Sequence, residues 1–274
     1  MKQWKKQLSA ALCAALLLGC LPMPALAEEN EEYDLTDIPG VIIEDPRIDR
    51  AEWNFALSLC ALDPELIKLA NKECLLSSTY EPSSKTKMKL RAAPGAGTMY
   101  LQSECAEALA ELFAGAEEAG YKLYLKSAYR AYKTQKTMYN NRLERNNGKD
   151  DGWVSKPGAS DHQTGLGCDV VPGSWKDKSM NSNMASTPEC QWMAEHCYEY
   201  GFVIRYPEDK QDITEINYEP WHLRYVGKEV ARYIWRNGLC LEEFHEQLQA
   251  AIDAYLAAGG DARRVEDLIQ TSAE

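Results

Sequence analysis

Hydrophobic and polar positions alternate with two different periods along this chain, and the changes of period predict its secondary structure. From residue 103 to 119, apolar side chains recur every three or four positions and Gly120 follows, which predicts an amphipathic helix. From 121 to 126, apolar and polar residues alternate one by one, which predicts a strand. Short apolar runs predict three further strands, at 167–171, 202–206 and 221–226.

Four other segments have the features of helices. They lie at 64–72, 131–145, 187–200 and 241–258, and the last is followed by Gly259 and a further short helix. The third begins with a Thr-Pro pair, which favours a helix start. Helices and strands interleave without the regular rhythm of a parallel sheet, so the predicted fold class is α+β.

The N-terminal segment 1–27 has the three parts of a secretory signal peptide. Three lysines precede an apolar run over 8–21, and Ala25-Leu26-Ala27 provides a cleavage site. The apolar run is shorter than the roughly 20 residues of a membrane-spanning helix. We therefore expect cleavage after Ala27 and a secreted, extracytoplasmic protein. In one alternative, the segment ending at Cys20 resembles a lipoprotein box and Cys20 carries a lipid anchor; in another, 1–27 is a buried helix.

Composition and charge exclude several classes of protein. Hydrophobic residues make up 45% and charged residues 26% of the 274 residues, which is typical of a globular domain and not of a disordered or fibrous chain. The 30 basic and 42 acidic residues give a net charge of −12, so nucleic acid is not an expected partner. Residues 28–65 form an acidic lead-in that contains several prolines.

Cleavage after Ala27 would leave seven of the nine cysteines: Cys60, Cys74, Cys105, Cys168, Cys190, Cys197 and Cys240. An oxidising compartment allows some of them to pair, while the odd number leaves at least one free or paired between chains. No two have CxxC spacing, so we do not expect a zinc site made of thiolates.

Two of the four histidines lie beside carboxylates in segments rich in glycine or aromatic residues. His162 precedes Asp169 within SDHQTGLGCD, and His222 follows Glu219 within EPWHLRY. Two imidazoles and one carboxylate form a three-ligand zinc site that leaves the fourth position for water. Gly165 and Gly167 allow a tight turn ahead of Asp169, which then enters a rigid apolar strand. We therefore expect His162, Asp169 and His222 to bind one zinc ion.

Glu219 is the expected general base. In an extended run Glu219 and His222 would point to opposite faces, so a shared site requires a turn at Pro220. The alternative is that the two histidine segments never meet and each forms an ordinary surface or core pair. His196 and His245, which lie beside glutamates on predicted helices, are expected to be solvated residues of a helix face.

A third polar segment, SAYRAYKTQ from Ser127, lies where a strand passes into a helix. The planar guanidinium of Arg130 suits a carboxylate or a developing oxyanion, because it can make two charge-assisted hydrogen bonds. The residues leave both roles open, and a surface salt bridge is the other alternative.

Three motifs in this order, SAYRAYKTQ, SDHQTGLGCDV and EPWHLRYVG, resemble those of the VanY-type zinc D-alanyl-D-alanine carboxypeptidases. The resemblance implies a small central antiparallel sheet flanked by helices, similar to the hedgehog signalling domain. It spans a domain at 66–228, with 229–274 as a C-terminal helical extension. It also implies one zinc ion per chain and a substrate cleft. The implied roles are zinc ligands for His162, Asp169 and His222, catalysis for Glu219 and Arg130, and substrate binding for Arg130, Gln135 and Ser160.

Cys168 departs from the family pattern, which usually has alanine at this position. Because it precedes Asp169, it could supply a competing thiolate or point away into the core. A cysteine enzyme built on Cys168 would also need a partner histidine motif, and the sequence has none that is recognisable.

The resemblance implies an enzyme of the cell envelope that removes the C-terminal D-alanine from peptidoglycan stem peptides. One alternative is an L,D-carboxypeptidase that trims tetrapeptide stems with the same chemistry. Another is a non-catalytic, zinc-stabilised module that binds the cell wall, although such a module would not need Glu219 as a base.

Overall fold

The structure is a computed structural model that describes residues 59–269. The predicted signal peptide, Cys20 and most of the acidic lead-in lie outside these residues. The described residues divide into two compact units, one of residues 59–62 with 247–269 and one of residues 63–246. Within the described part, no helix is both long enough and apolar enough to span a bilayer.

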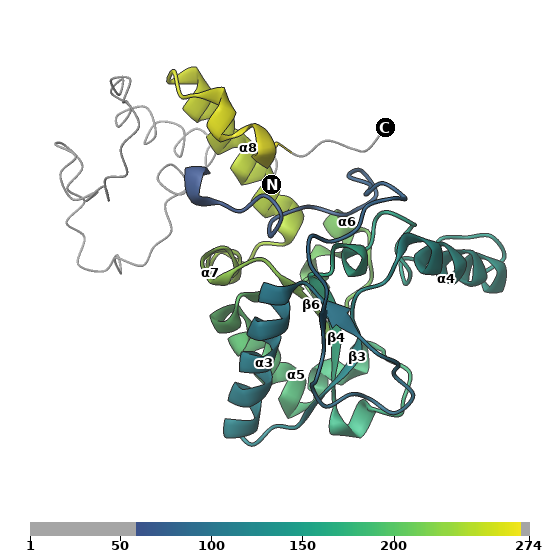
Figure 1. Ribbon diagram of the computed structural model, residues 1–274. Helices are drawn as coiled ribbons and strands as arrows, with labels where there is room; N and C mark the ends of the chain where they lie inside the picture. The colour runs from purple at the N-terminus through teal and green to yellow at the C-terminus, as the bar shows by residue number, and fades with distance from the viewer. Residues whose placement is uncertain (1–58, 270–274) are drawn as a thin grey trace. The chain divides into compact units, whose positions relative to one another are not determined.

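A four-stranded antiparallel sheet lies in the second unit (Figure 1). Its strands are β3 (Leu123–Ser127), β4 (Gly167–Pro172), β5 (Phe202–Ile204) and β6 (His222–Tyr225), in the order β3-β4-β6-β5. All four strands were predicted from the sequence. A two-stranded antiparallel pair, β1 (Thr86–Lys87) and β2 (Tyr100–Leu101), was not.

Among the described residues of the second unit, five helices accompany this sheet: α3 (Ser103–Glu118), α4 (Tyr132–Arg145), α5 (Pro188–His196), α6 (Gln211–Thr214) and α7 (Lys228–Arg236). Helix α8 (Leu241–Ala257) begins in this unit and continues into the other. The predicted helices at 103–119, 131–145 and 241–258 are confirmed, and the one at 187–200 becomes 3₁₀ from Cys197 to Tyr200. The predicted α+β class with a small antiparallel sheet is confirmed.

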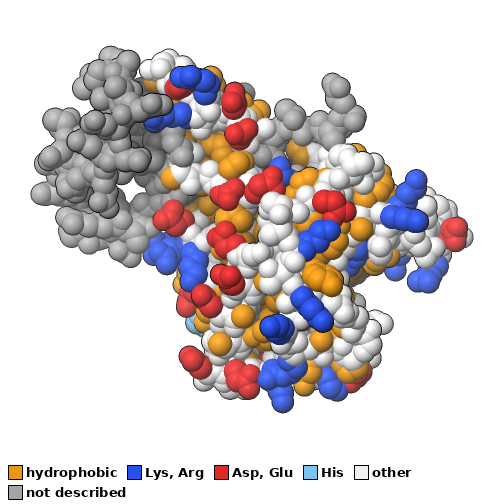
Figure 2. Space-filling model, viewed as in Figure 1, with side chains coloured by type: hydrophobic (Ala, Val, Ile, Leu, Met, Phe, Trp, Pro, Cys, Tyr) orange, Lys and Arg blue, Asp and Glu red, His pale blue; other side chains and the backbone are white. Residues whose placement is uncertain are grey.

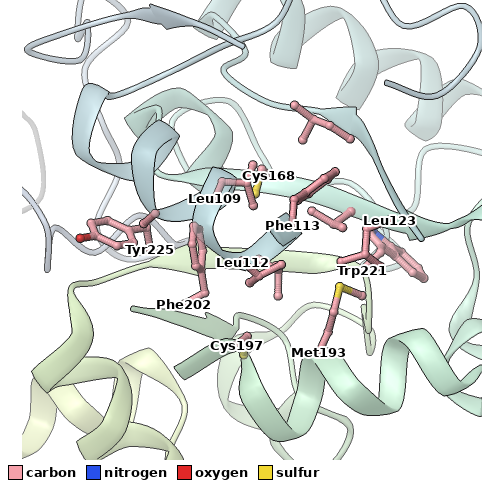
Figure 3. Close-up of a cluster of buried hydrophobic side chains, with 14 of the residues drawn as sticks. Leu109, Leu112, Phe113, Leu123, Cys168, Met193, Cys197, Phe202, Trp221 and Tyr225 are labelled. Carbon is pink, nitrogen blue, oxygen red and sulfur yellow. The ribbon is translucent and has the colours of Figure 1, made fainter. Parts of the chain in front are cut away.

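The hydrophobic core joins α3 and α5 to the sheet. Leu109, Leu112 and Phe113 of α3 contribute to one buried cluster with Met193 of α5 and strand residues such as Phe202 (Figure 3). Cys168 belongs to the same cluster and has no exposed surface. Because neighbouring residues of a strand point to opposite faces, the packing of Cys168 into this core directs Asp169 away from it.

The helix predicted at 64–72 is absent, and turns occupy this segment. Its carbonyl groups bind side chains from elsewhere in the chain. The carbonyls of Leu66 and Lys68 accept hydrogen bonds from Arg224, and that of Ile67 lies 2.6 Å from Nε2 of His245. In a helix these carbonyls would accept hydrogen bonds from the helix's own amides, so the non-helical path is the one that leaves them free to bind the buried arginine.

No disulfide joins the cysteines at 74, 105, 168, 190, 197 and 240, which are all free. Most of them are buried, and burial raises the pKa of the Cys168 thiol well above its usual value. The thiol therefore stays protonated in the core, which argues against a competing thiolate at this position.

Candidate metal centre

The register of the sheet places three site residues in one row. Ser127 of β3 lies opposite Asp169 of β4, and Asp169 lies opposite His222 of β6. Directly opposed residues of antiparallel strands have Cβ atoms about 5 Å apart on the same face. The sheet therefore brings Asp169 and His222 together although they are 53 residues apart in sequence.

His162 reaches this row from a buried 3₁₀ turn, Asp161–Thr164. Gly165 ends the turn with a φ of +71°, which a glycine adopts without strain. A Cβ on Gly167 would come within 2.9 Å of the backbone carbon of Asp161, so only glycine lets β4 begin this close to the turn. The two glycines thus determine where His162 lies relative to Asp169.

The three side chains converge, as the sequence analysis expected. One ligand atom from each of His162, Asp169 and His222 lies within 4.8 Å of the others. Nε2 of His162 is 3.4 Å from Oδ2 of Asp169, and Nδ1 of His222 is 3.0 Å from Oδ1 of Asp169. All three residues are buried, with at most 4% of their surface exposed.

This cluster fits zinc. Ligand atoms about 2.1 Å from a tetrahedral zinc ion lie about 3.4 Å apart, close to the 3.4 and 3.0 Å that separate the Asp169 oxygens from His162 and His222. Nδ1 of His162 lies 2.7 Å from the carbonyl of Ala128, a contact that leaves Nε2 free to coordinate. Nε2 of His222 is buried without a hydrogen-bond partner among the described residues, so its ring is not satisfied by protein contacts alone.

The charge states of the cluster also suit a cation. Burial lowers the pKa of His162 to about 4, and the nearby Arg130 adds to the effect, so the imidazole is neutral at pH 7. Burial disfavours the charge of Asp169, but His162 and His222 outweigh it and hold the pKa of this carboxyl well below its usual range. Neutral imidazole and carboxylate are the forms that bind metals.

Glu219 lies at the edge of the cluster, and the predicted bend at Pro220 is present. The amide of His222 donates to the carbonyl of Glu219 at 3.1 Å, which closes a turn. This turn brings Oε2 of Glu219 to 3.8 Å from Nδ1 of His222. Burial raises the pKa of the Glu219 carboxyl well above its usual value, the charge of Asp169 raises it further, and Arg130 opposes the shift. A bound dication would lower this pKa again.

Arg130 is held by two side chains beside the cluster. Its Nη1 donates to Oε1 of Gln135 at 2.8 Å, and its Nη2 donates to Oγ of Ser127 at 3.0 Å. Gln135 in turn donates to the carbonyl of Ser155 at 2.7 Å. The guanidinium is therefore fixed in orientation before any ligand arrives.

The proposed ligands and Glu219 line one pocket of about 420 Å³. Arg130, Gln135 and Ser160 line it too, so the pocket contains every site residue expected from the sequence. Sequence reasoning missed other lining residues: Met138, Arg142, Trp153, Met180, Asn181 and Tyr206. Trp153 stacks on Trp221 with ring centroids 6.4 Å apart. Apart from Tyr206, at the end of the predicted strand 202–206, these residues lie outside the predicted motifs, although Met138 and Arg142 share a helical face with Gln135.

A buried ion network supports the cluster from behind, and the sequence analysis did not identify it. Asp161, next to His162, accepts hydrogen bonds from Nε of Arg205 at 2.7 Å and from Nη1 of Arg224. Arg205 also binds Glu242, near the start of α8. All of these side chains are at most one-tenth exposed. Buried charges are stable only when paired in this way.

The other two histidines do not join the site. His196 lies at the surface, with Nδ1 2.9 Å from Oε1 of Glu199, as expected. The expectation of a solvated His245 is wrong, because this ring is largely covered and bonded to the carbonyl of Ile67. Burial lowers the pKa of His245 to about 4.

A small α+β fold with a buried His-Asp-His cluster, a buried carboxyl group and a fixed arginine in one pocket defines a metallopeptidase. The chain belongs to the VanY family, because its residues 98–228 match the family described as VanY, D-alanyl-D-alanine carboxypeptidase. This chain is also 39% identical to the Bacillus subtilis (strain 168) protein YodJ over 191 residues, which make up 68% of this chain and 70% of YodJ.

Two solved structures agree with this assignment. The LdcB LD-carboxypeptidase is 40% identical, with a TM-score of 0.62, and the match covers 67% of this chain and 87% of LdcB. A VanY D,D-pentapeptidase variant, solved in complex with Zn(II), is 28% identical with a TM-score of 0.55, and the match covers 66% and 98% of the two chains. The chain is therefore a carboxypeptidase of the VanY family, and the ligand atoms of its His-Asp-His cluster suit the kind of ion, Zn(II), that the VanY structure holds.

Proposed function

We propose that this chain removes the C-terminal D-alanine from peptidoglycan stem peptides as a D,D-carboxypeptidase. The observation that carries the proposal is the convergence of His162, Asp169 and His222 beside the buried Glu219, in a pocket that also contains Arg130. The family's description and a VanY structure with bound D-alanine-D-alanine support this substrate.

We assign His162, Asp169 and His222 as the zinc ligands. Zinc held there supplies Lewis acidity, which makes water nucleophilic near neutral pH and polarises a peptide carbonyl. Glu219 acts as general base: its carboxylate takes a proton from the attacking water and delivers it to the leaving amine. Oε2 of Glu219 lies 3.8 Å from Nδ1 of His222, so Glu219 is a neighbour of the three proposed ligands and is not itself one of them.

Arg130 binds the C-terminal carboxylate of the substrate or stabilises the oxyanion, and Gln135 fixes it in place. Ser160, which is buried and lines the pocket, offers a hydroxyl to the substrate backbone. The carboxylate role would restrict the enzyme to the last peptide bond, because an internal bond has no carboxylate at this distance.

A second candidate activity is favoured by the LdcB structure, which shares more sequence identity with this chain than the VanY variant does. In that case the scissile bond joins an L-centre to the terminal D-alanine of a tetrapeptide. The zinc site and Glu219 would act in the same way, and the walls of the pocket would select the substrate.

Incubation of the purified zinc-loaded protein with pentapeptide and tetrapeptide stems, followed by mass spectrometry, tests the proposal. Loss of one alanine from the pentapeptide alone supports D,D-activity, and loss from the tetrapeptide alone supports the second candidate. We expect Glu219→Gln to keep zinc and reduce kcat by at least about 10²-fold. Release of no alanine from either peptide would contradict both.

We further propose that the protein acts outside the cytoplasmic membrane, where its substrate lies, after removal of residues 1–27 or lipidation at Cys20. The mass of the mature protein isolated from its host distinguishes the two. An N-terminus at Glu28 supports cleavage, and an acylated N-terminus at Cys20 supports a lipid anchor.

A further inference from the structure

One face of α4 forms a wall of the pocket. Gln135, Met138 and Arg142 all line it, and their spacing of three and then four residues places them on one side of the helix. Gln135 is buried, whereas Met138 has 38% of its surface exposed. The wall therefore runs from the buried partner of Arg130 towards solvent and ends at Arg142.

Arg142 is held in place by Asp151. Its Nε lies 3.1 and 3.0 Å from the two carboxylate oxygens of Asp151, and its Nη2 lies 2.5 Å from Oδ2. Of this pair, only Arg142 lines the pocket. A guanidinium has five N–H donors, and no described residue accepts a hydrogen bond from Nη1 of Arg142. One edge of this partly exposed guanidinium is thus available to a ligand.

The length of the helix relates Arg142 to a position in the substrate. Gln135 and Arg142 are seven residues apart, which corresponds to about 10 Å along a helix axis. An extended peptide advances about 3.4 Å per residue, so the same distance takes up about three residues. If Arg130 binds the terminal carboxylate, Arg142 lies level with a residue about three positions upstream.

The charge of helix α4 favours an anionic group on the substrate near Arg142. Helix α4 carries four basic residues (Lys133, Lys136, Arg142 and Arg145) against one acidic residue, although the whole chain has a net charge of −12. Lys and Arg side chains gather over α4 at the right of Figure 2. Asp151 offsets the charge of Arg142, and the other basic residues of the helix leave an excess of positive charge that attracts carboxylates to this end of the pocket.

Building on the proposed function, we propose that Arg142 is a specificity-determining residue that binds a free carboxylate on the stem peptide, about three residues before the C-terminus. Met138 packs against the aliphatic part of the intervening residues. A carboxamide at the same position can still accept through its carbonyl oxygen but carries no negative charge, so it loses the charge-assisted hydrogen bond and the site discriminates acid from amide.

Two synthetic stem peptides that differ only in a carboxylate or a carboxamide at that position test the inference. We expect the zinc-loaded protein to cleave the acid about tenfold more efficiently in kcat/KM, with the difference mainly in KM. We expect R142Q to reduce the acid's kcat/KM to that of the amide. K136Q removes a charge from an exposed residue of the same helix and should keep the preference.

Equal cleavage of both peptides by the unmodified protein would overturn the inference and leave the proposed function intact. An equal loss on both peptides in R142Q would also overturn it, because Arg142 would then only anchor the loop that carries Asp151. Cleavage of neither peptide by the unmodified protein would overturn the proposed function, and this inference with it.

Discussion

Glu242 binds Arg205 through both of its carboxylate oxygens, at 2.7 and 2.8 Å, in the interior of the second unit. Glu242 lies beyond residue 228, where the family match ends, and Arg205 also binds Asp161 next to the metal cluster. The start of the predicted C-terminal extension is therefore part of the structure that supports the site.

Removal of the Glu242 charge should destabilise the protein. In E242A the guanidinium of Arg205 loses one of its two buried anionic partners, which typically costs about 3–5 kcal/mol of unfolding free energy. Urea denaturation measures this change, and E246A, at an exposed position of the same helix, serves as control. A loss below about 1 kcal/mol in E242A would show that the network contributes little.

Replacement of a proposed ligand should abolish zinc binding. H222A and H162A are expected to retain less than about one-tenth of the zinc found in the unmodified protein, because two ligands hold the ion weakly. H196A, at the surface, should retain it. Zinc per chain is measured by elemental analysis after dialysis, and full zinc in H222A would exclude this residue as a ligand.

Stability in the metal-free protein should fall as the solution becomes acidic. His245 has a folded pKa of about 4, below its usual 6.5, so the unfolded chain binds the proton first and stability decreases from about pH 6.5 towards pH 4. His245 contributes about 2 kcal/mol to the loss between pH 7 and pH 5. Arg205 and Arg224 favour the neutral ring, and Glu242 opposes them.

H245Q tests the contribution of this ring, because glutamine can still donate to the carbonyl of Ile67 but does not titrate. Its unfolding free energy should depend less on pH than that of the unmodified chain. H196Q provides the matched surface control. An unchanged pH dependence in H245Q would assign the acid sensitivity to other groups, such as His162.

Glycine is required at position 167 by the close approach of Asp161. In G167A the new methyl group would meet Asp161 atoms at 2.9 Å, and overpacking of this kind typically costs about 1–3 kcal/mol. G97A adds the same group where nothing lies within 4 Å. We expect a lower melting temperature and weaker zinc binding in G167A alone; equal behaviour of the two variants would contradict this.

Arg130 should be replaceable by lysine only with a loss of activity. Lysine keeps the charge, but its compact ammonium group lacks the planar fork with which Arg130 spans Gln135, Ser127 and a substrate carboxylate. In R130K we expect KM for a stem peptide to rise at least about tenfold if Arg130 binds the terminal carboxylate. A reduced kcat at unchanged KM would indicate the oxyanion role instead.

The amino-acid sequence by itself determined the strands, the principal helices and the motifs that carry the chemistry. Periodicity predicts each strand because side-chain burial alternates along it, and the spacing around His162 and Glu219 identified candidate groups before their positions were known. The bend at Pro220 could be predicted because proline restricts the backbone locally.

Only the tertiary structure decided which residues meet. The pairing of Asp169 with His222 follows from strand register. Residues 64–72 form turns because Arg224 binds carbonyl groups that would otherwise accept hydrogen bonds within a helix. The place of Arg142 at the end of the pocket and the burial of His245 follow likewise from packing. Such contacts join residues that are distant in sequence. Local sequence patterns do not predict these contacts, because each contact depends on how whole helices and strands pack.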